Sequence, residues 1–379
     1  MRILLIDDLA QRGWKQILEI VLFENNPIDF AEDYNSAKYK LENNIYDLIF
    51  LDLRLNENDH NQNDVMQFNG FKIINEIIRK DFISINFPTP VIVFSATNKI
   101  WNIDTMIHHG ADNYYIKEHP DFSFDPQYSK ENFKRLKLTV SELIKIGIKR
   151  REVWFKIKNI QDKLDKIDNL NIRSRVGEKL KIGYGLLFRR TTIIEDKNLI
   201  FNNQIISFIA FWSVLEEIVK DSFVDNWIKI GNNEGKMKED KWILKNRNVF
   251  IEDLTTFNLG KNEGYVEVGI KYNPVNSYYE VGKVKFEQNN PEIKYYLGKI
   301  SLSLQVYAVL LLEKKWTPVK SKKTFNNLND YRNKIDFIHS SVSSIFNEKL
   351  SKKDDDIEGY NKCLEMLNFL DEILNSPMH

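Results

Sequence analysis

The sequence is poor in cysteine, with Cys363 as the single thiol among 379 residues. One thiol excludes an intramolecular disulfide and any zinc site built on cysteines, and it suits a reducing compartment. The chain also lacks an excess of either charge, because 54 lysine and arginine residues balance 54 aspartate and glutamate residues. No overall field therefore draws the chain to nucleic acid or to an anionic membrane, so any RNA contact has to come from a local patch.

Long hydrophobic runs are missing as well. The chain starts with MRILLIDD, in which an apolar run of four residues ends at two aspartates. This start matches neither a signal peptide nor a membrane span, and we expect a cytoplasmic protein with no membrane partner. The hydrophobic fraction of 42% is sufficient for packed cores, and the length favours at least two domains.

Short apolar runs alternate with helical patterns through the first 125 residues. The runs cover residues 3–6, 48–51, 91–94 and 114–116, and polar residues follow the first three. Runs without polar alternation indicate strands that are covered on both faces, as in a parallel α/β sheet. We therefore predict a doubly wound α/β domain in the N-terminal third.

Acidic residues follow two of these predicted strands. Asp7 and Asp8 come after the first run, and Asp52 comes after the run at 48–51. The carboxyl ends of parallel strands lie at one edge of a sheet, so the three carboxylates are expected to converge there. They would repel one another without a cation, and Mg²⁺ is the ion that prefers such oxygen ligands. Ser95 and Lys117 end two further runs and could bind a phosphoryl group.

The segments ILLIDD, LIFLDLRL, VIVFSAT and GADNYYIK resemble, in this order, those of response-regulator receiver domains. The resemblance covers about 120 residues and implies a flavodoxin-like fold with a five-stranded parallel sheet. It implies that Asp52 accepts a phosphoryl group from a sensor histidine kinase or a phosphotransfer protein. It further implies a Mg²⁺ site formed by Asp7, Asp8, Asp52 and the backbone carbonyl of Arg54.

The same resemblance implies that Ser95 and Tyr114 form a switch pair. The serine would be drawn to the new phosphoryl group, and the aromatic ring would turn inward behind it. Two features depart from the family pattern: the loop at 56–69 is longer than usual, and Glu118 stands where a proline commonly follows the lysine. The first concerns access to the site, and the second concerns the geometry of the turn after Lys117.

A basic helical pattern occupies residues 129–167. It fits a solvated amphipathic helix that packs on its own domain, and it fits equally a partner-binding helix that carries a signal. We predict a receiver domain at 1–125, a helical linker at 126–170 and a mainly α-helical output domain at 171–379.

The output half contains an aromatic-rich helical pattern at 204–229 and a strand-like alternation at 264–287. We predict a long helix for the first, an inserted β-hairpin for the second, and a return to helix from Glu292 onward. No basic recognition helix of a helix-turn-helix is present in the sequence, so transcriptional output is not favoured.

Arg332 and His339 are seven residues apart in a helical pattern, so both project from one face. A histidine can move the proton of an RNA 2′-hydroxyl, and an arginine can stabilise charge on the phosphate oxygens, without a metal. The structural alternatives to a catalytic role are an ion pair of Arg332 with Asp336 and a capped or core position for His339.

The Arg-Asn-(five residues)-His pattern resembles that of HEPN domains, a helical family with many ribonucleases of bacterial defence and RNA processing. The aromatic segment FWSVLEEIVKD resembles the first long helix of that family. The resemblance implies a homodimer with both motifs in one cleft, Asn333 as an orienting residue and Glu216 as a supporting group. The function expected from the sequence is a phosphorylation-controlled response regulator whose output is a metal-independent HEPN-type endoribonuclease. The alternative is a non-catalytic adaptor whose helical half dimerises or docks a partner when Asp52 is phosphorylated.

Overall fold

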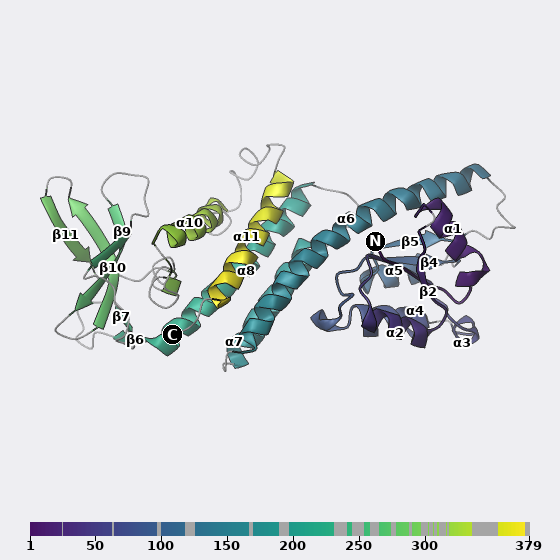
Figure 1. The fold of residues 1–379 in the computed structure, drawn as a ribbon, viewed down its shortest axis with the longest axis horizontal. Helices are drawn as coiled ribbons and strands as arrows, with labels where there is room; N and C mark the ends of the chain where they lie inside the picture. Colours follow the sequence, from purple (N-terminus) through teal and green to yellow (C-terminus); the bar gives the residue numbers. More distant parts are fainter. Residues whose placement is uncertain are drawn as a thin grey trace. The chain divides into compact units, whose positions relative to one another are not determined.

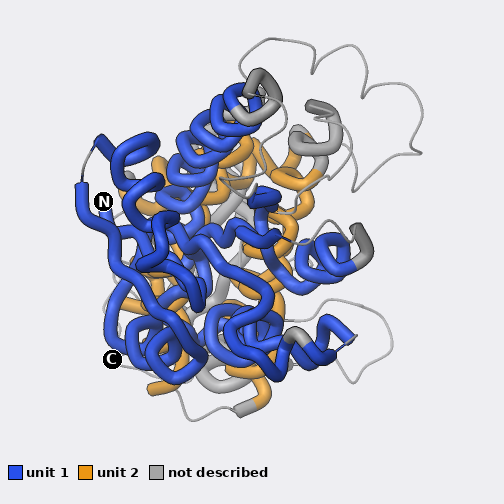
Figure 2. Tube along the Cα trace, turned by 90° about the vertical axis from the view of Figure 1, so that its right-hand side faces the viewer, with its two compact units in different colours: residues 1–154 blue, residues 155–379 orange. Residues whose placement is uncertain are grey.

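The protein is described by a computed structural model that divides into two compact units, Met1–Trp154 and Phe155–His379 (Figure 2). In unit 1 and the adjoining helices it describes residues 1–24, 26–62, 64–96, 100–117, 126–166, 170–188 and 197–230. Further along the chain it describes 241–244, 254–257, 265–273, 278–287, 290–296, 302, 306, 309–310, 316, 318–335 and 355–375. The two units are considered separately.

Unit 1 is built on a five-stranded parallel sheet in the order β2-β1-β3-β4-β5. Figure 1 labels β2, β4 and β5 of this sheet. The strands are β1 (Ile3–Ile6), β2 (Asp29–Ala31), β3 (Leu48–Leu51), β4 (Val91–Ser95) and β5 (Asn113–Ile116). This is the flavodoxin-like order, in which the strand order reverses between β1 and β3. The prediction of a five-stranded parallel α/β sheet is confirmed.

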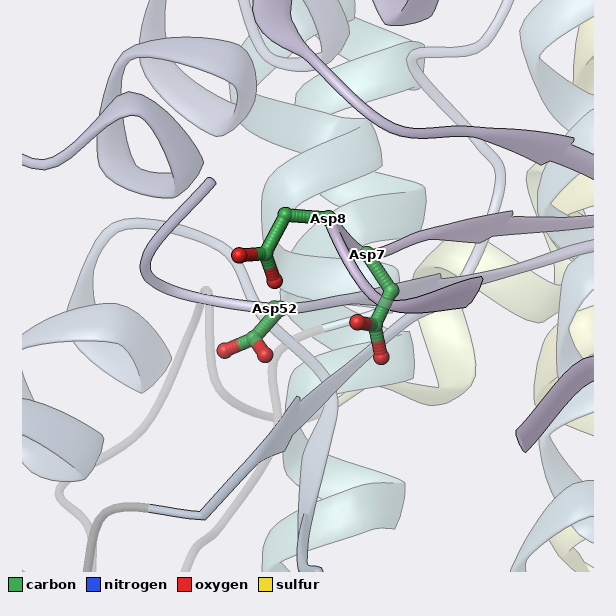
Figure 3. Close-up of side chains that lie close together, drawn as sticks. All are labelled: Asp7, Asp8 and Asp52. Atoms are coloured by element: carbon green, nitrogen blue, oxygen red, sulfur yellow. The ribbon is translucent and has the colours of Figure 1, made fainter. Parts of the chain in front are cut away.

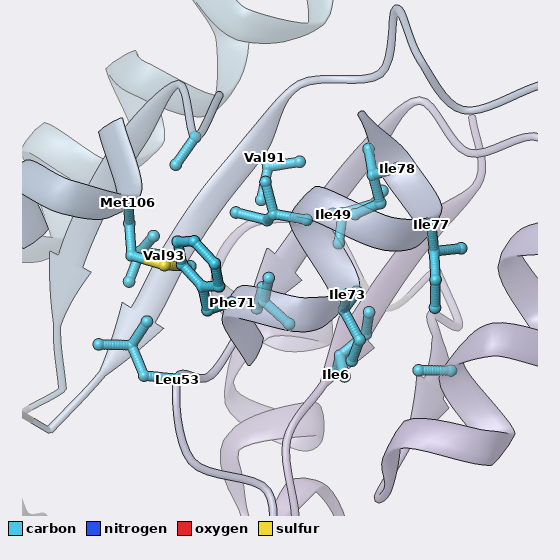
Figure 4. Packing of buried hydrophobic residues seen from close by; sticks show 14 of the residues in the cluster. Ile6, Ile49, Leu53, Phe71, Ile73, Ile77, Ile78, Val91, Val93 and Met106 are labelled. Carbon is cyan, nitrogen blue, oxygen red and sulfur yellow. The ribbon is translucent and has the colours of Figure 1, made fainter. Parts of the chain in front are cut away.

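Alternate residues of the strands pack into two separate hydrophobic clusters, one on each face of the sheet. One face is covered by α2 (Tyr34–Asn43), by α4 (Asn69–Lys72) with its π-helical continuation Ile73–Ile78, and by α5 (Ile100–His108). Figure 4 shows this cluster, with Ile49, Val91 and Val93 of the sheet beside Phe71 and Ile73. Because both faces are buried, the inner strands β1 and β3 are apolar at every position.

The other face is covered by α1 (Trp14–Val21) and by the first part of α6 (Pro126–Leu164). Leu136, Val140 and Leu143 of α6 belong to the same cluster as Ile3, Leu5 and Phe50 of the sheet. The compact unit that contains the sheet extends to Trp154. The first half of the predicted linker packs on its own domain because the sheet needs a second helix on this face.

Within the described residues, the long helices of unit 2 are α7 (Leu170–Leu187), α8 (Lys197–Asn226), α10 (Pro318–Lys334) and α11 (Asp355–Asn375). Aromatic rings connect three of them: the Phe325 ring centroid on α10 lies 5.8 Å from that of Trp212 on α8 and 6.2 Å from that of Phe369 on α11. Phe208, Phe211 and Trp212 of α8 are therefore core residues of a helical bundle. Among the described residues, no helix combines the length and apolar character that crossing a membrane requires.

Unit 2 also contains an antiparallel sheet, which has six strands within the described residues. They are β6 (Trp227–Ile230), β7 (Lys241–Leu244), β8 (Leu254–Phe257), β9 (Tyr265–Asn273), β10 (Tyr278–Glu287) and β11 (Asn290–Tyr296). The predicted hairpin corresponds to β9 and β10, which pair as two members of this larger sheet. The helix predicted from Glu292 is wrong over its first residues, because Ile293 and Tyr295 alternate as strand residues and pair with Phe286 and Val284.

Candidate functional site

Three carboxylates converge at the carboxyl end of the sheet in unit 1. The neighbouring strands β1 and β3 pair Ile6 with Leu51, so the residues that follow, Asp7 and Asp52, leave the sheet side by side. Oxygens of Asp7, Asp8 and Asp52 lie within 4.8 Å of one another (Figure 3). Asp7 is fully buried, Asp52 is buried and Asp8 is half-buried.

Lys117 brings a positive charge to this edge from the end of β5. Its Nζ donates to Asp7 Oδ2 and to Asp52 Oδ2, at 2.5 Å in each case. The lysine backbone is fixed as well, because its N–H donates to the carbonyl of Ser95 at 2.9 Å. Residues from three strand ends thus meet as the order of their segments in the chain predicts.

Among the described residues, the charges of Asp7, Asp52 and Lys117 are not balanced, because the two carboxylates share one ammonium. Burial raises the pKa of Asp7 above its usual value; Lys117 opposes this shift and the charge of Asp52 adds to it. Burial alone would lower the pKa of Lys117, but the two carboxylates hold it above its usual value. A divalent cation would relieve this imbalance, and hard oxygen donors of this kind fit Mg²⁺.

The segment after Asp52 turns back over its own carboxylate. Asp52 Oδ1 accepts the backbone N–H of Leu53 at 2.6 Å and lies 3.5 Å from that of Arg54. The Arg54 guanidinium lies 5.0 Å from the ring centroid of Phe68. This arrangement holds the residue whose carbonyl is the predicted additional metal ligand.

The predicted switch residues occupy opposite environments. Ser95 ends β4 at the acidic edge and is buried, with 6% of its surface exposed. Tyr114 lies on β5 next to Val93 of β4 and points outward, with 49% exposed. Glu118, the second departure from the family pattern, lies outside the described residues.

Gly70 supports the site in a way that the sequence did not reveal. Its N–H donates to the carbonyl of Leu53 at 3.1 Å, and a Cβ at this position would lie 2.3 Å from the backbone oxygen of Asp52. Any larger residue would displace the strand end that carries Asp52. The signal in the sequence was a single glycine after a long loop, which has no specific meaning without the fold.

The candidate residues of unit 2 are only partly brought together. Arg332 and Asn333 lie near the end of α10, and the arginine Nη1 donates to Asn333 Oδ1 at 3.2 Å. The neighbouring Tyr331 ring centroid is 4.9 Å from that of Phe208 on α8, and Glu216 is half-buried on the same helix. His339 lies outside the described residues.

No family model matches the chain, and no curated protein matches it. Solved structures match its N-terminal part. A CheY-like receiver domain protein from Methanospirillum hungatei JF-1 is 19% identical over 37% of this chain and 96% of its own, with a TM-score of 0.27. The response regulator TrrA from Thermotoga maritima, in complex with Mg²⁺-BeF, is 28% identical over 36% of this chain and 97% of its own, with a TM-score of 0.25.

A two-component response regulator from Clostridium difficile is 25% identical over 36% of this chain and 98% of its own, with a TM-score of 0.25. The fold of unit 1 is identified by its strand order, which is that of receiver domains.

Proposed function

We propose that unit 1 is the receiver domain of a two-component response regulator and takes a phosphoryl group on Asp52. The observation that carries the proposal is the convergence of Asp7, Asp8 and Asp52 within 4.8 Å, with Lys117 bonded to two of them. Two of these carboxylates share one ammonium, and burial together with the charge of Asp52 raises the pKa of Asp7. Groups perturbed by burial and by a neighbouring charge are concentrated at functional sites.

The donor is a phosphohistidine of a sensor histidine kinase or of a phosphotransfer protein. An oxygen of Asp52 attacks the phosphorus; the new O–P bond forms as the P–N bond breaks, and the electron pair returns to the imidazole. Asp7, Asp8, Asp52 and the Arg54 carbonyl would hold Mg²⁺, which when bound offsets charge between the carboxylate and the incoming phosphoryl oxygens. Lys117 contributes a fixed positive charge, and Ser95 a hydroxyl at the same edge.

The proposal is tested by incubating the full chain with Mg²⁺ and a small acyl phosphate, and measuring the intact mass. We expect the wild type to gain a phosphoryl group and Asp52→Asn to gain none. Asp104→Asn is the matched control, since Asp104 is an exposed aspartate of the same unit, on α5. Phosphorylation of Asp52→Asn at the wild-type rate would contradict the assignment.

For the output we propose a HEPN-type, metal-independent endoribonuclease that works as a homodimer. Its support is the position of Arg332 and Asn333 on α10, next to Tyr331, whose ring packs on the aromatic helix α8. In this proposal His339 moves the 2′-hydroxyl proton, Arg332 stabilises the phosphate oxygens, Asn333 orients the arginine and Glu216 supports the motif from α8.

Total RNA and transfer RNA are the substrates for the test, with the protein phosphorylated or not and with the metal then chelated. We expect cleavage that persists without metal and is lost in His339→Ala but kept in His108→Ala, where an exposed histidine of unit 1 is removed. Cleavage that is equal in the two variants would contradict the ribonuclease proposal.

The adaptor function is the second candidate, and α6 favours it. This helix runs without interruption from Pro126 to Leu164, so its residues belong to both units. An adaptor would change its assembly state on phosphorylation and cleave no RNA. Light scattering of the wild type and Asp52→Asn after treatment with acyl phosphate separates the two candidates.

A further inference from the structure

The long loop between Asp52 and Gly70 is organised around one buried carboxylate. It contains the short helix α3 (Glu57–His60), which begins after Asn56, whose side chain accepts the N–H of Asp59 at 3.0 Å. The Asp59 side chain faces inward, and only 2% of the residue is exposed. A carboxylate in such a place needs donors to offset the loss of water.

Asp59 obtains these donors from the two ends of the loop. Its Oδ2 accepts the N–H of Leu55 at 2.8 Å, on the side where the chain leaves the site. Its two oxygens lie 3.3 and 3.4 Å from the N–H of Asn69, directly before Gly70, where the chain returns. One side chain therefore closes the loop and joins its outgoing and returning ends.

This closure acts on the segment that borders the acidic site. Leu53 is held by Asp52 Oδ1 through its N–H and by Gly70 through its carbonyl. Leu55 is held by Asp59. Arg54 lies between these two fixed residues, so the position of its carbonyl depends on both attachments.

We propose that Asp59 is a positioning residue for the divalent cation: it fixes the Arg54 carbonyl beside Asp52 by holding the backbone of Leu55 and Asn69. The inference rests on the proposed receiver function. Groups that orient metal ligands without touching the metal commonly change its affinity by about 10- to 100-fold when they are removed. The role of Asp59 belongs to this class.

The test is calorimetric titration of the full chain with Mg²⁺, together with thermal unfolding of the Mg²⁺-free protein. We expect Asp59→Ala to raise the Mg²⁺ Kd by about tenfold. Asp59→Asn, which keeps an acceptor oxygen, should recover part of the affinity, and it remains usable if the alanine variant does not fold. Asp64→Ala is the matched control, because the side chain of exposed Asp64 caps a turn in the same loop by accepting the N–H of Met66, at 3.0 Å.

The titration separates this inference from the function on which it rests. A wild type that binds no Mg²⁺ overturns both. A wild type that binds, with an unchanged Kd in folded Asp59→Ala or Asp59→Asn, overturns the positioning role alone. The same holds if Asp64→Ala weakens binding as much, because the effect would then come from general loosening of the loop. A higher Kd in the Asp59 variants but not in Asp64→Ala supports the proposal.

Discussion

The two ends of the sheet in unit 1 contain buried aspartates in opposite electrostatic conditions. At the carboxyl end, Asp7 and Asp52 share Lys117. At the amino end, Asp112 has two arginine partners: Arg79 at 3.2 Å and Arg150 at 2.7 Å. Asp112 also accepts the N–H of Val91 at 2.9 Å, so its carboxylate is bonded by both arginines and by a backbone N–H.

The pKa values point the same way. Burial would raise the pKa of Asp47, at the amino end, but the bonds from Arg151 and from the N–H of Arg2 lower it below its usual value. The pKa of Asp7 is raised. The ionised carboxylate of Asp47 therefore stabilises the fold, whereas the ionised form of Asp7 is disfavoured in the folded protein unless further positive charge binds beside it. The difference indicates that the carboxyl end is shaped for a ligand rather than for stability.

The largest effect that tests this comparison is expected at Asp112. Asp112→Ala removes the shared partner of two guanidinium groups and leaves the Val91 N–H without its acceptor. We expect a loss of about 3–5 kcal/mol in the free energy of unfolding, measured by urea denaturation at neutral pH. The exposed contact between the Asp104 carboxylate and the His108 ring, 3.5 Å long, provides the control, and Asp104→Ala should change stability little. Equal effects of the two variants would show that the amino end is not a structural anchor.

Asp47 should give an intermediate effect that depends on pH. Its bonds to Arg151 Nη1 and to the N–H of Arg2, each 2.7 Å long, stabilise the ionised carboxylate. Because the folded-state pKa lies below the ordinary value of 3.8, the stabilisation is present above that pH and is lost as pH falls through the lower folded value. We expect Asp47→Asn to cost about 1 kcal/mol at neutral pH. Urea denaturation at several pH values measures the difference, which should vanish in acid; a difference independent of pH would assign it to packing instead.

Much of unit 1 was predictable because its signals are redundant. Continuous apolar runs predicted β1, β3, β4 and β5 but not the short strand β2. A parallel sheet brings the residues after β1 and β3 to one edge. The convergence of Asp7 and Asp52 follows from these two facts. The place of α6 was less predictable, since Leu136 and Val140 form an amphipathic stripe that reads the same whether it packs on its own sheet or on a partner. Asp59 could not be found, because its role depends on the closure of an irregular loop.

Unit 2 was less predictable because its signals come from few residues. The aromatic stripe of α8 was a reliable sign of a buried face, as Phe208 and Trp212 show. The strands β6, β7 and β8 have four residues each, and β7 also pairs with β10, which is distant in the chain, so single-segment patterns do not reveal the sheet. The spacing of Arg332 and His339 predicts that both lie on one face of a helix. It does not predict which residues or which ligand that face contacts. Their roles remain a prediction.

The smallest expected effect is a gain in the free energy of unfolding, whereas the variants of Asp112 and Asp47 are expected to lose stability. It tests the comparison of the two sheet ends most directly. Asp7→Asn removes a buried charge whose folded-state pKa is raised, so the variant should be more stable than the wild type without Mg²⁺, by about 1 kcal/mol at neutral pH. The ionised Asp7 destabilises the folded wild type. This destabilisation is absent below the ordinary pKa of 3.8 and grows as pH rises through the higher folded-state pKa. The stability gained by Asp7→Asn should therefore be absent in acid and grow over the same pH range. Thermal unfolding with and without Mg²⁺ measures both parts: the ion should raise the Tm of the wild type and leave that of Asp7→Asn nearly unchanged. If Asp7→Asn is less stable than the wild type at neutral pH, Asp7 is a structural ion-pair partner of Lys117, and the two ends of the sheet are then alike.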